Sequence, residues 1–218
     1  YVWERSLDIG GRVEGKTESL GLAFTDYGYA YDDVGQLTEV IDHEDNDAVV
    51  ESYDYDANGN RIASTVDYGT AVSRTYSYNA DVQLTSVNSG EIEYSYDLDG
   101  FLTVRRRDTG SIVEATGYNY NIRGDLLSVE LPSGGAVERV AYMYDALGRR
   151  IARRAYDDGD TLLSTEKYLW NGLRQLLAVY DGSNQLQMRF DYLGGGSPVG
   201  VDVWDGTDMP AGRVEHDS

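Results

Sequence analysis

The sequence repeats one short motif, and its clearest copy is Tyr-Met-Tyr-Asp-Ala-Leu-Gly-Arg-Arg-Ile at residues 142–151. Alternate side chains of an extended strand share a face, so Tyr142 and Tyr144 project together. Asp145 can accept hydrogen bonds from the N–H groups of a turn, and Gly148 can adopt the positive φ that the last turn residue often needs. The motif therefore predicts a strand, a tight turn and a second strand.

Copies of this motif recur along most of the chain, and the second aromatic residue of the motif recurs at intervals of 18 to 26 residues. Such an interval accommodates two strands and two turns, so the predicted repeat unit is a β-hairpin. Asn replaces Asp in two copies, and a last copy keeps only Phe190 and Tyr192. The predicted structural motif residues are Tyr29, Tyr31, Asp32, Gly35, Tyr53, Tyr55, Asp56, Gly59, Tyr76, Tyr78, Asn79, Tyr94, Tyr96, Asp97, Gly100, Tyr118, Tyr120, Asn121, Gly124, Tyr142, Tyr144, Asp145, Gly148, Tyr168 and Trp170.

The repetition predicts an all-β chain whose antiparallel hairpins form one continuous curved sheet. We expect residues 1–26 to be a partial repeat, residues 27–193 the hairpin array, and residues 194–218 an irregular closing strand and tail. The aromatic pairs should form rows on one face, because a register slip of one residue would turn them to the other face. Val82 stands where a turn glycine is expected. A β-branched residue resists positive φ, so we expect a different turn there, which would also account for the 18-residue interval that follows.

Composition excludes several classes of function. The net charge of −20 repels phosphate backbones and anionic lipids, so we expect no nucleic-acid partner. No apolar stretch is long enough to span a bilayer, so we expect no membrane insertion. The absence of cysteine excludes disulfides, thiolate metal sites and cysteine nucleophiles. No signal peptide is recognisable in this sequence, which begins abruptly, so we expect a fragment whose targeting segments lie elsewhere in a longer polypeptide.

Three copies of the motif show a family resemblance: Tyr-Asp-Ala-Leu-Gly-Arg-Arg-Ile at 144–151, Tyr-Asp-Ala-Asn-Gly-Asn-Arg-Ile at 55–62 and Tyr-Leu-Trp-Asn-Gly-Leu at 168–173. They resemble the YD-repeat, or Rhs-repeat, family, and the resemblance covers about residues 27–200. That family includes polymorphic toxins, the C components of insecticidal toxin complexes and the teneurins, whose repeats wind a strip of antiparallel sheet into a hollow shell.

The resemblance implies a segment of shell wall that is secreted or at the cell surface. Its implied partners are the remainder of a larger YD-repeat polypeptide, an enclosed cargo or like subunits. Toxin-bearing members carry a self-cleavage segment rich in proline and aspartate after the repeats. Residues 199–218 do not match that segment, so autoproteolysis and toxin activity are not carried over to this chain.

Candidate catalytic and metal motifs are explained better by turns. Residues 108–110 spell the Asp-Thr-Gly triplet of aspartic proteases, but they lie where a hairpin turn belongs. Residues 54–59 begin like a calcium loop, yet its twelfth position is Thr65, where a bidentate Glu is needed. His43 and His216 lie outside any nucleophile motif. We therefore predict no catalytic residue, metal site or cofactor, although the acidic turns at 42–47 and 157–160 could bind calcium weakly.

The leading hypothesis is a non-enzymatic structural shell segment that encloses or scaffolds a cargo or self-assembles through its sheet edges. The alternative is an extracellular adhesion or glycan-binding module, because rows of tyrosine rings can also stack on sugars. A hydrolase that acts through paired carboxylates stays open, because acidic residues are abundant. The arginine clusters at 105–107 and 149–154 are expected to pair with glutamates on neighbouring strands.

Overall fold

The computed structural model describes residues 2–21, 23–204 and 213–215, and this part of the chain is all-β. It contains no α-helix, and one 3₁₀ turn, η1 (Asn88–Gly90), separates two strands. The strands are β1 (Val2–Leu7), β2 (Val13–Leu20), β3 (Ala23–Tyr31), β4 (Leu37–Asp42), β5 (Ala48–Tyr55), β6 (Arg61–Val66), β7 (Val72–Tyr78), β8 (Leu84–Val87), β9 (Ile92–Tyr96), β10 (Leu102–Asp108), β11 (Val113–Tyr120), β12 (Leu126–Glu130), β13 (Arg139–Tyr144), β14 (Arg150–Tyr156), β15 (Leu162–Asn171), β16 (Gln175–Asp181), β17 (Leu186–Asp191), β18 (Gly200–Val203) and β19 (Arg213–Glu215).

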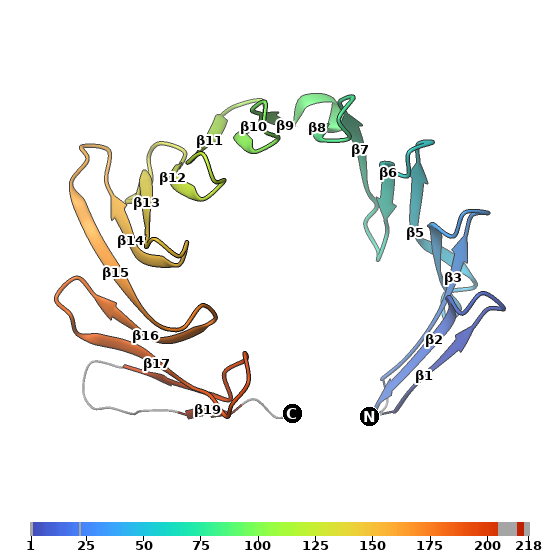
Figure 1. The fold of residues 1–218 in the computed structure, drawn as a ribbon. Helices are drawn as coiled ribbons and strands as arrows, with labels where there is room; N and C mark the ends of the chain where they lie inside the picture. Colours follow the sequence, from blue (N-terminus) through green and yellow to red (C-terminus); the bar gives the residue numbers. More distant parts are fainter. Residues whose placement is uncertain (1, 22, 205–212, 216–218) are drawn as a thin grey trace. The chain divides into compact units, whose positions relative to one another are not determined.

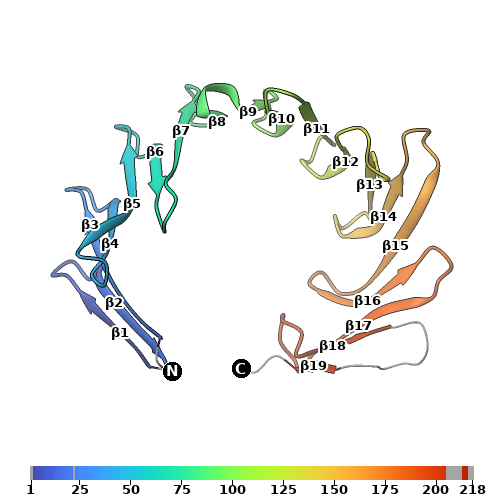
Figure 2. The same cartoon turned by 180° about the vertical axis from the view of Figure 1, so that it is seen from behind.

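The strands belong to two compact units, Tyr1–Tyr94 with Arg107–Thr109 and Ser95–Arg106 with Gly110–Ser218. In the first unit β1 to β8 pair in chain order, each antiparallel to the strand before it (Figure 1). The start of β9 then pairs antiparallel with β8 through Ile92 and Glu93. In the second unit β11 to β19 do the same (Figure 2). The predicted all-β array of antiparallel hairpins is confirmed.

The motif turns share one backbone conformation. Asp32 N–H donates to the carbonyl of Gln36 at 3.0 Å, and Gly35 N–H donates to the carbonyl of Asp32 at 3.0 Å. Gly35 has φ 87°, and the strand register shifts between Ala30 and Tyr31. This is a type I turn followed by a residue in the left-handed region, which adds a bulge to the hairpin. The extra residue explains why the motif needs glycine three positions after the acid.

The prediction of a different turn at Val82 is wrong. Val82 adopts φ 63°, and its N–H donates to the carbonyl of Asn79 at 3.1 Å, as in the other motif turns. The two paired strands and the Asn79 side chain impose the conformation, so the β-branched residue bears the strain. The short interval of 18 residues between Tyr78 and Tyr96 has another cause. The strand β8 has only four residues, and the 3₁₀ turn η1 connects it to β9.

The buried apolar side chains are valines and alanines, and some of them lie opposite the first tyrosine of a doublet. Tyr29 faces Val40 and Tyr76 faces Val87 across their hairpins, and both valines are 6% exposed. The tyrosines are themselves half-buried, whereas Met143, between two of them, is 41% exposed. The strands therefore have a tyrosine face that covers the valines and a more exposed opposite face.

The two ends of the array are described only in part. The expected partial repeat at residues 1–26 folds as β1, β2 and the start of β3, which pair in order. In the expected closing segment, β18 pairs with β17 and β19. The expected loose tail lies mostly outside the described residues, as does His216.

Candidate functional site

The motif acid or amide closes each turn with its side chain. Oδ1 of Asp145 accepts hydrogen bonds from Leu147 N–H at 2.9 Å and Arg149 N–H at 3.0 Å. Both bonds need only a side-chain oxygen, which explains why Asn can replace Asp in this Asx turn. The same pair of bonds is made by Asp32, Asp56, Asn79, Asp97 and Asn121.

The second aromatic of the doublet lies at or next to the end of its strand and forms an inter-hairpin hydrogen bond. The Tyr144 hydroxyl donates to the carbonyl of Leu126 at 2.9 Å, at the start of the second strand of the preceding hairpin. Trp170 donates through Nε1 to the carbonyl of Arg150 at 2.7 Å. Equivalent bonds run from Tyr31 to Val13, Tyr55 to Leu37, Tyr78 to Arg61 and Tyr192 to Leu176.

Sequence reasoning missed these inter-hairpin hydrogen bonds, because it treated the tyrosine rows only as packing that sets the register. Their signal was available in the copy that ends in Trp170, since Trp replaces Tyr with another aromatic that carries a donor. The remaining doublets occupy equivalent places, with Tyr94 and Tyr96 ending β9 and Tyr118 and Tyr120 ending β11. Tyr120 stacks on Phe101 with ring centroids 5.1 Å apart.

The partial repeat expected at residues 1–26 contains a motif turn near the beginning of the chain. Oδ1 of Asp8 accepts from Gly10 N–H at 2.8 Å and Arg12 N–H at 2.9 Å, and Gly11 has φ 80°. The next residue, Val13, is the acceptor for Tyr31. Asp8 lies three residues before Gly11, as in the other copies, but no aromatic doublet directly precedes it.

Successive motif turns also contact one another. A Cβ on Gly59 would lie 2.9 Å from Nε2 of Gln36, and one on Gly124 would lie 2.6 Å from Cζ of Phe101. Gln36 and Phe101 each follow the glycine of the preceding turn, so the residue after one turn glycine packs on the next. Positive φ favours glycine at both positions, and at Gly124 the Phe101 ring adds a close approach that a Cβ would have to displace.

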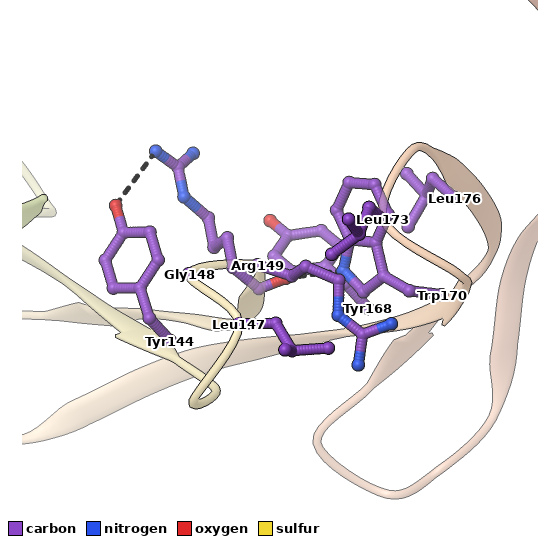
Figure 3. Close-up of a pocket in the computed structure, with 9 residues that line it drawn as sticks. Tyr144, Leu147, Gly148, Arg149, Tyr168, Trp170, Leu173 and Leu176 are labelled. Carbon is purple, nitrogen blue, oxygen red and sulfur yellow. Dashed lines mark hydrogen bonds between the residues drawn. The ribbon is translucent and has the colours of Figure 1, made fainter. Parts of the chain in front are cut away.

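A cleft of about 670 Å³ lies between two such turns in the second unit (Figure 3). It combines apolar and aromatic side chains with two arginines. Its lining consists of Tyr144, Leu147, Gly148, Arg149, Arg150, Tyr168, Trp170, Leu173 and Leu176.

A family model described as Teneurin YD-shell matches residues 3–192. The chain belongs to the teneurin YD-shell family. This confirms the resemblance seen in the repeated motif, and it makes the chain a structural segment of a YD-shell.

Two solved structures resemble this YD-shell chain in fold. A crystal structure of TcdB2-TccC3 gives a TM-score of 0.61 at 16% identity and covers 83% of this chain. One of TcdB2-TccC3-TEV gives 0.60 at 14% identity and covers 95%. The YD-shell chain spans only 11% and 14% of the length of those two chains. Comparison with curated proteins gives no match.

The carboxylates of this YD-shell chain are engaged in its turns. Nε of Arg149 donates to Oδ2 of Asp145 at 2.7 Å, and this bond holds the pKa of Asp145 below its usual value. The Asn60 side chain lowers the pKa of Asp56 in the same way. Arg149 therefore pairs within its own turn, whereas a cross-strand pair of the expected kind joins Arg153 to Glu166 at 3.3 Å.

Several tyrosine hydroxyls donate to glutamates. Glu51 accepts from Tyr53 and, at 2.8 Å, from Tyr68. Burial, with Glu51 beside it, raises the pKa of Tyr53 to about 12, because both disfavour the phenolate. The guanidinium of Arg61 lies 4.3 Å from the ring centroid of Tyr53, and that of Arg150 lies 4.1 Å from that of Tyr142. In these two doublets, one ring face is already covered by an arginine.

The acidic turns are largely occupied by internal bonds. Oδ1 of Asp42 accepts from Glu44 N–H at 2.9 Å, Asp47 lies 2.6 Å from Nδ1 of His43, and Asp160 pairs with Arg139 at 2.6 Å. Within residues 2–21, 23–204 and 213–215, no group of three or more His, Cys, Asp or Glu side chains is placed to hold a metal. The Asp108 backbone N–H donates to the carbonyl of Glu91 at 2.8 Å, as expected of a residue at a hairpin end.

Proposed function

We propose that this chain is a non-enzymatic wall segment of a longer YD-shell polypeptide that encloses or scaffolds a cargo such as a toxin-like C-terminal segment. The observation that carries the proposal is the inter-hairpin hydrogen bond, exemplified by Tyr144 and Leu126. In the copies that form it, this bond joins a side chain of one hairpin to the backbone of its predecessor, so the array can be extended by neighbour contacts. The motif residues are thereby used in building the wall.

The extent of the related structures supports a larger polypeptide. The TcdB2-TccC3 chain is matched over only 11% of its length, so the rest of such a shell would come from other parts of the same polypeptide or from like subunits. We propose residues 27–193 as the core of the segment, with residues 1–26 and 194–218 as its ends. Secretion or display at the cell surface is part of the proposal. The described residues include no helix of a length and apolarity suited to crossing a membrane.

Protection from protease tests enclosure. The full polypeptide that carries this chain is treated with a broad-specificity protease before and after its shell is opened by Gly148→Pro, which cannot adopt the φ of 78° found there. We expect a cargo segment to survive in the native polypeptide and to be cleaved in the variant. A Leu162→Ser variant at an exposed strand position is the control and should protect the cargo fully. Equal cleavage of cargo in all three proteins would refute enclosure.

One rival of this function and one variant of it can be tested separately. Glycan binding through the tyrosine rows would be lost in Tyr120→Ala and Tyr144→Ala with the circular dichroism spectrum unchanged, and a glycan array measures it. The geometry gives it less support, because the Tyr144 hydroxyl is bonded inside the chain and Tyr120 stacks on Phe101. Self-assembly through open sheet edges would appear as concentration-dependent oligomers in size-exclusion chromatography.

A further inference from the structure

The cleft beside Trp170 differs in charge from equivalent clefts in other hairpins. A cleft of about 390 Å³ lies between the motif turns that begin at Asp32 and Asp56, and both aspartates line it. Another of about 330 Å³ is lined in part by Asp97. The cleft of about 670 Å³ is lined by Arg149 and Arg150 and by no acidic side chain. In a chain of net charge −20, it is a basic and apolar cleft.

The two arginines of this cleft have different roles. Arg149 is fully engaged, since it bonds Asp145 and donates through Nη1 to the carbonyl of Gly172 at 2.5 Å. Arg150 pairs with no carboxylate within the described residues. Its Nε is buried without a hydrogen-bond partner there, and its Nη2 only reaches the Tyr144 hydroxyl at 3.4 Å. Figure 3 draws this bond as the dashed line that starts at Tyr144. A half-buried guanidinium that pairs with no carboxylate favours an anionic partner.

The motif turn does not require arginine at position 150. The equivalent second residue after the turn glycine is leucine in four other copies, at Leu37, Leu84, Leu102 and Leu126. Each of these leucines begins the second strand of its hairpin, as Arg150 does. The local fold accommodates an apolar side chain there, so the turn does not depend on the arginine, whose guanidinium lies over the Tyr142 ring.

The walls of the cleft are apolar and continue onto its rims. The Trp170 ring is fixed by its Nε1 bond to the carbonyl of Arg150, and Leu176 lies beside it. Leu147 and Leu173, at the tips of the two flanking turns, are 64% and 65% exposed. A small ligand inside the cleft would leave these two leucines in water, whereas an extended segment crossing both turns would cover them.

We propose that this cleft binds a polypeptide segment in which a carboxylate lies beside large apolar side chains. The carboxylate pairs with Arg150, and the apolar side chains contact Trp170, Leu173 and Leu147. Charge complementarity selects the segment, because this cleft is basic while its equivalents are acidic. The site goes beyond the wall function and does not depend on what the shell encloses.

Binding of a defined peptide tests the proposal. The probe is a fluorescein-labelled peptide, Gly-Phe-Glu-Leu-Gly with an amidated end, and the readout is fluorescence anisotropy with the 218-residue chain. We expect Arg150→Leu to weaken binding at least tenfold, with the hairpin retained because leucine occupies the equivalent positions. Arg61→Leu is the matched control, since Arg61 holds the same motif position and stacks on Tyr53, and it should change affinity less than twofold. Leu173→Ser, at an exposed turn tip, should weaken binding at least threefold.

Several results would overturn the proposal. A peptide with Gln in place of Glu that binds equally well would remove the role of the carboxylate. An equal loss in Arg61→Leu would show general attraction to positive charge. Failure of the wild-type chain to bind the peptide, or binding of sodium dodecanoate in its place, would refute a polypeptide occupant.

Discussion

Replacing Tyr144 by Phe removes one hydroxyl and keeps the aromatic ring, so it isolates the inter-hairpin hydrogen bond to Leu126. A hydrogen bond of this kind contributes about 1 kcal/mol to stability, because the folded state exchanges it for bonds to water. A local loss of about 1 kcal/mol corresponds to about fivefold faster opening of the structure that the bond holds closed. The loss should be confined to β12 and β13, which the bond joins.

Amide hydrogen exchange followed by mass spectrometry or NMR measures this effect strand by strand. Tyr142→Phe is the matched control, since the structure describes no hydrogen bond from that hydroxyl and the Arg150 guanidinium lies over its ring. Tyr55→Phe should produce the same acceleration in β4 and β5, where its acceptor Leu37 lies, and leave β12 unchanged. Equal exchange in Tyr144→Phe and Tyr142→Phe would refute the role assigned to the hydroxyl. Acceleration spread over the whole chain would refute stabilisation by neighbours.

Three further predictions concern the motif turns. Val82→Gly should raise the free energy of unfolding by about 0.5–1 kcal/mol, measured by urea denaturation, because it relieves a β-branched residue at φ 63°; a lower midpoint would contradict the strain. Gly148→Ala and Gly124→Ala place the same methyl group at similar φ values, 78° and 82°, but only the methyl at position 124 meets Phe101. Gly124→Ala should therefore lower the free energy of unfolding by about 1–3 kcal/mol more than Gly148→Ala. Equal melting temperatures of the two variants would show that Phe101 moves freely. The pKa of Asp145 is lowered in the folded chain, so its ionised carboxylate stabilises the fold. This stabilisation is fully present above the unfolded pKa of about 3.9 and is lost as the pH falls through the folded pKa. Asp145→Asn keeps the Asx-turn oxygen, so its melting temperature should fall less than that of the wild type between about pH 4 and pH 2, and parallel curves would oppose this account.

Much of the fold was predictable because its information is local. The tyrosine doublet, the acid and the glycine lie within seven residues, and each acts on atoms of the same turn, as Asp145 does with Leu147 and Arg149. Alternation along a strand then places both tyrosines on one face. Repetition multiplied a weak local signal into a prediction of the whole hairpin array.

The errors arose where one hairpin acts on another. Propensity predicted a new turn at Val82, but paired strands on both sides hold the residue at φ 63°. The acceptors of Tyr31, Tyr55, Tyr78, Tyr144 and Tyr192 lie 16 to 18 residues earlier, in the preceding hairpin, and no local rule connects them. The cleft at Arg150 likewise needs two turns to be placed side by side before its charge has meaning.

The sequence by itself determined the hairpin unit, the chemistry of its turn and the family, because these depend on residues that are close along the chain. Only the tertiary structure decided which carbonyls the bonded aromatic donors reach, which glycines are crowded, and that Arg150 lies in a cleft with no acidic lining. Those properties depend on the register between neighbouring hairpins, and register is set by the summed contacts of whole strands rather than by a single motif.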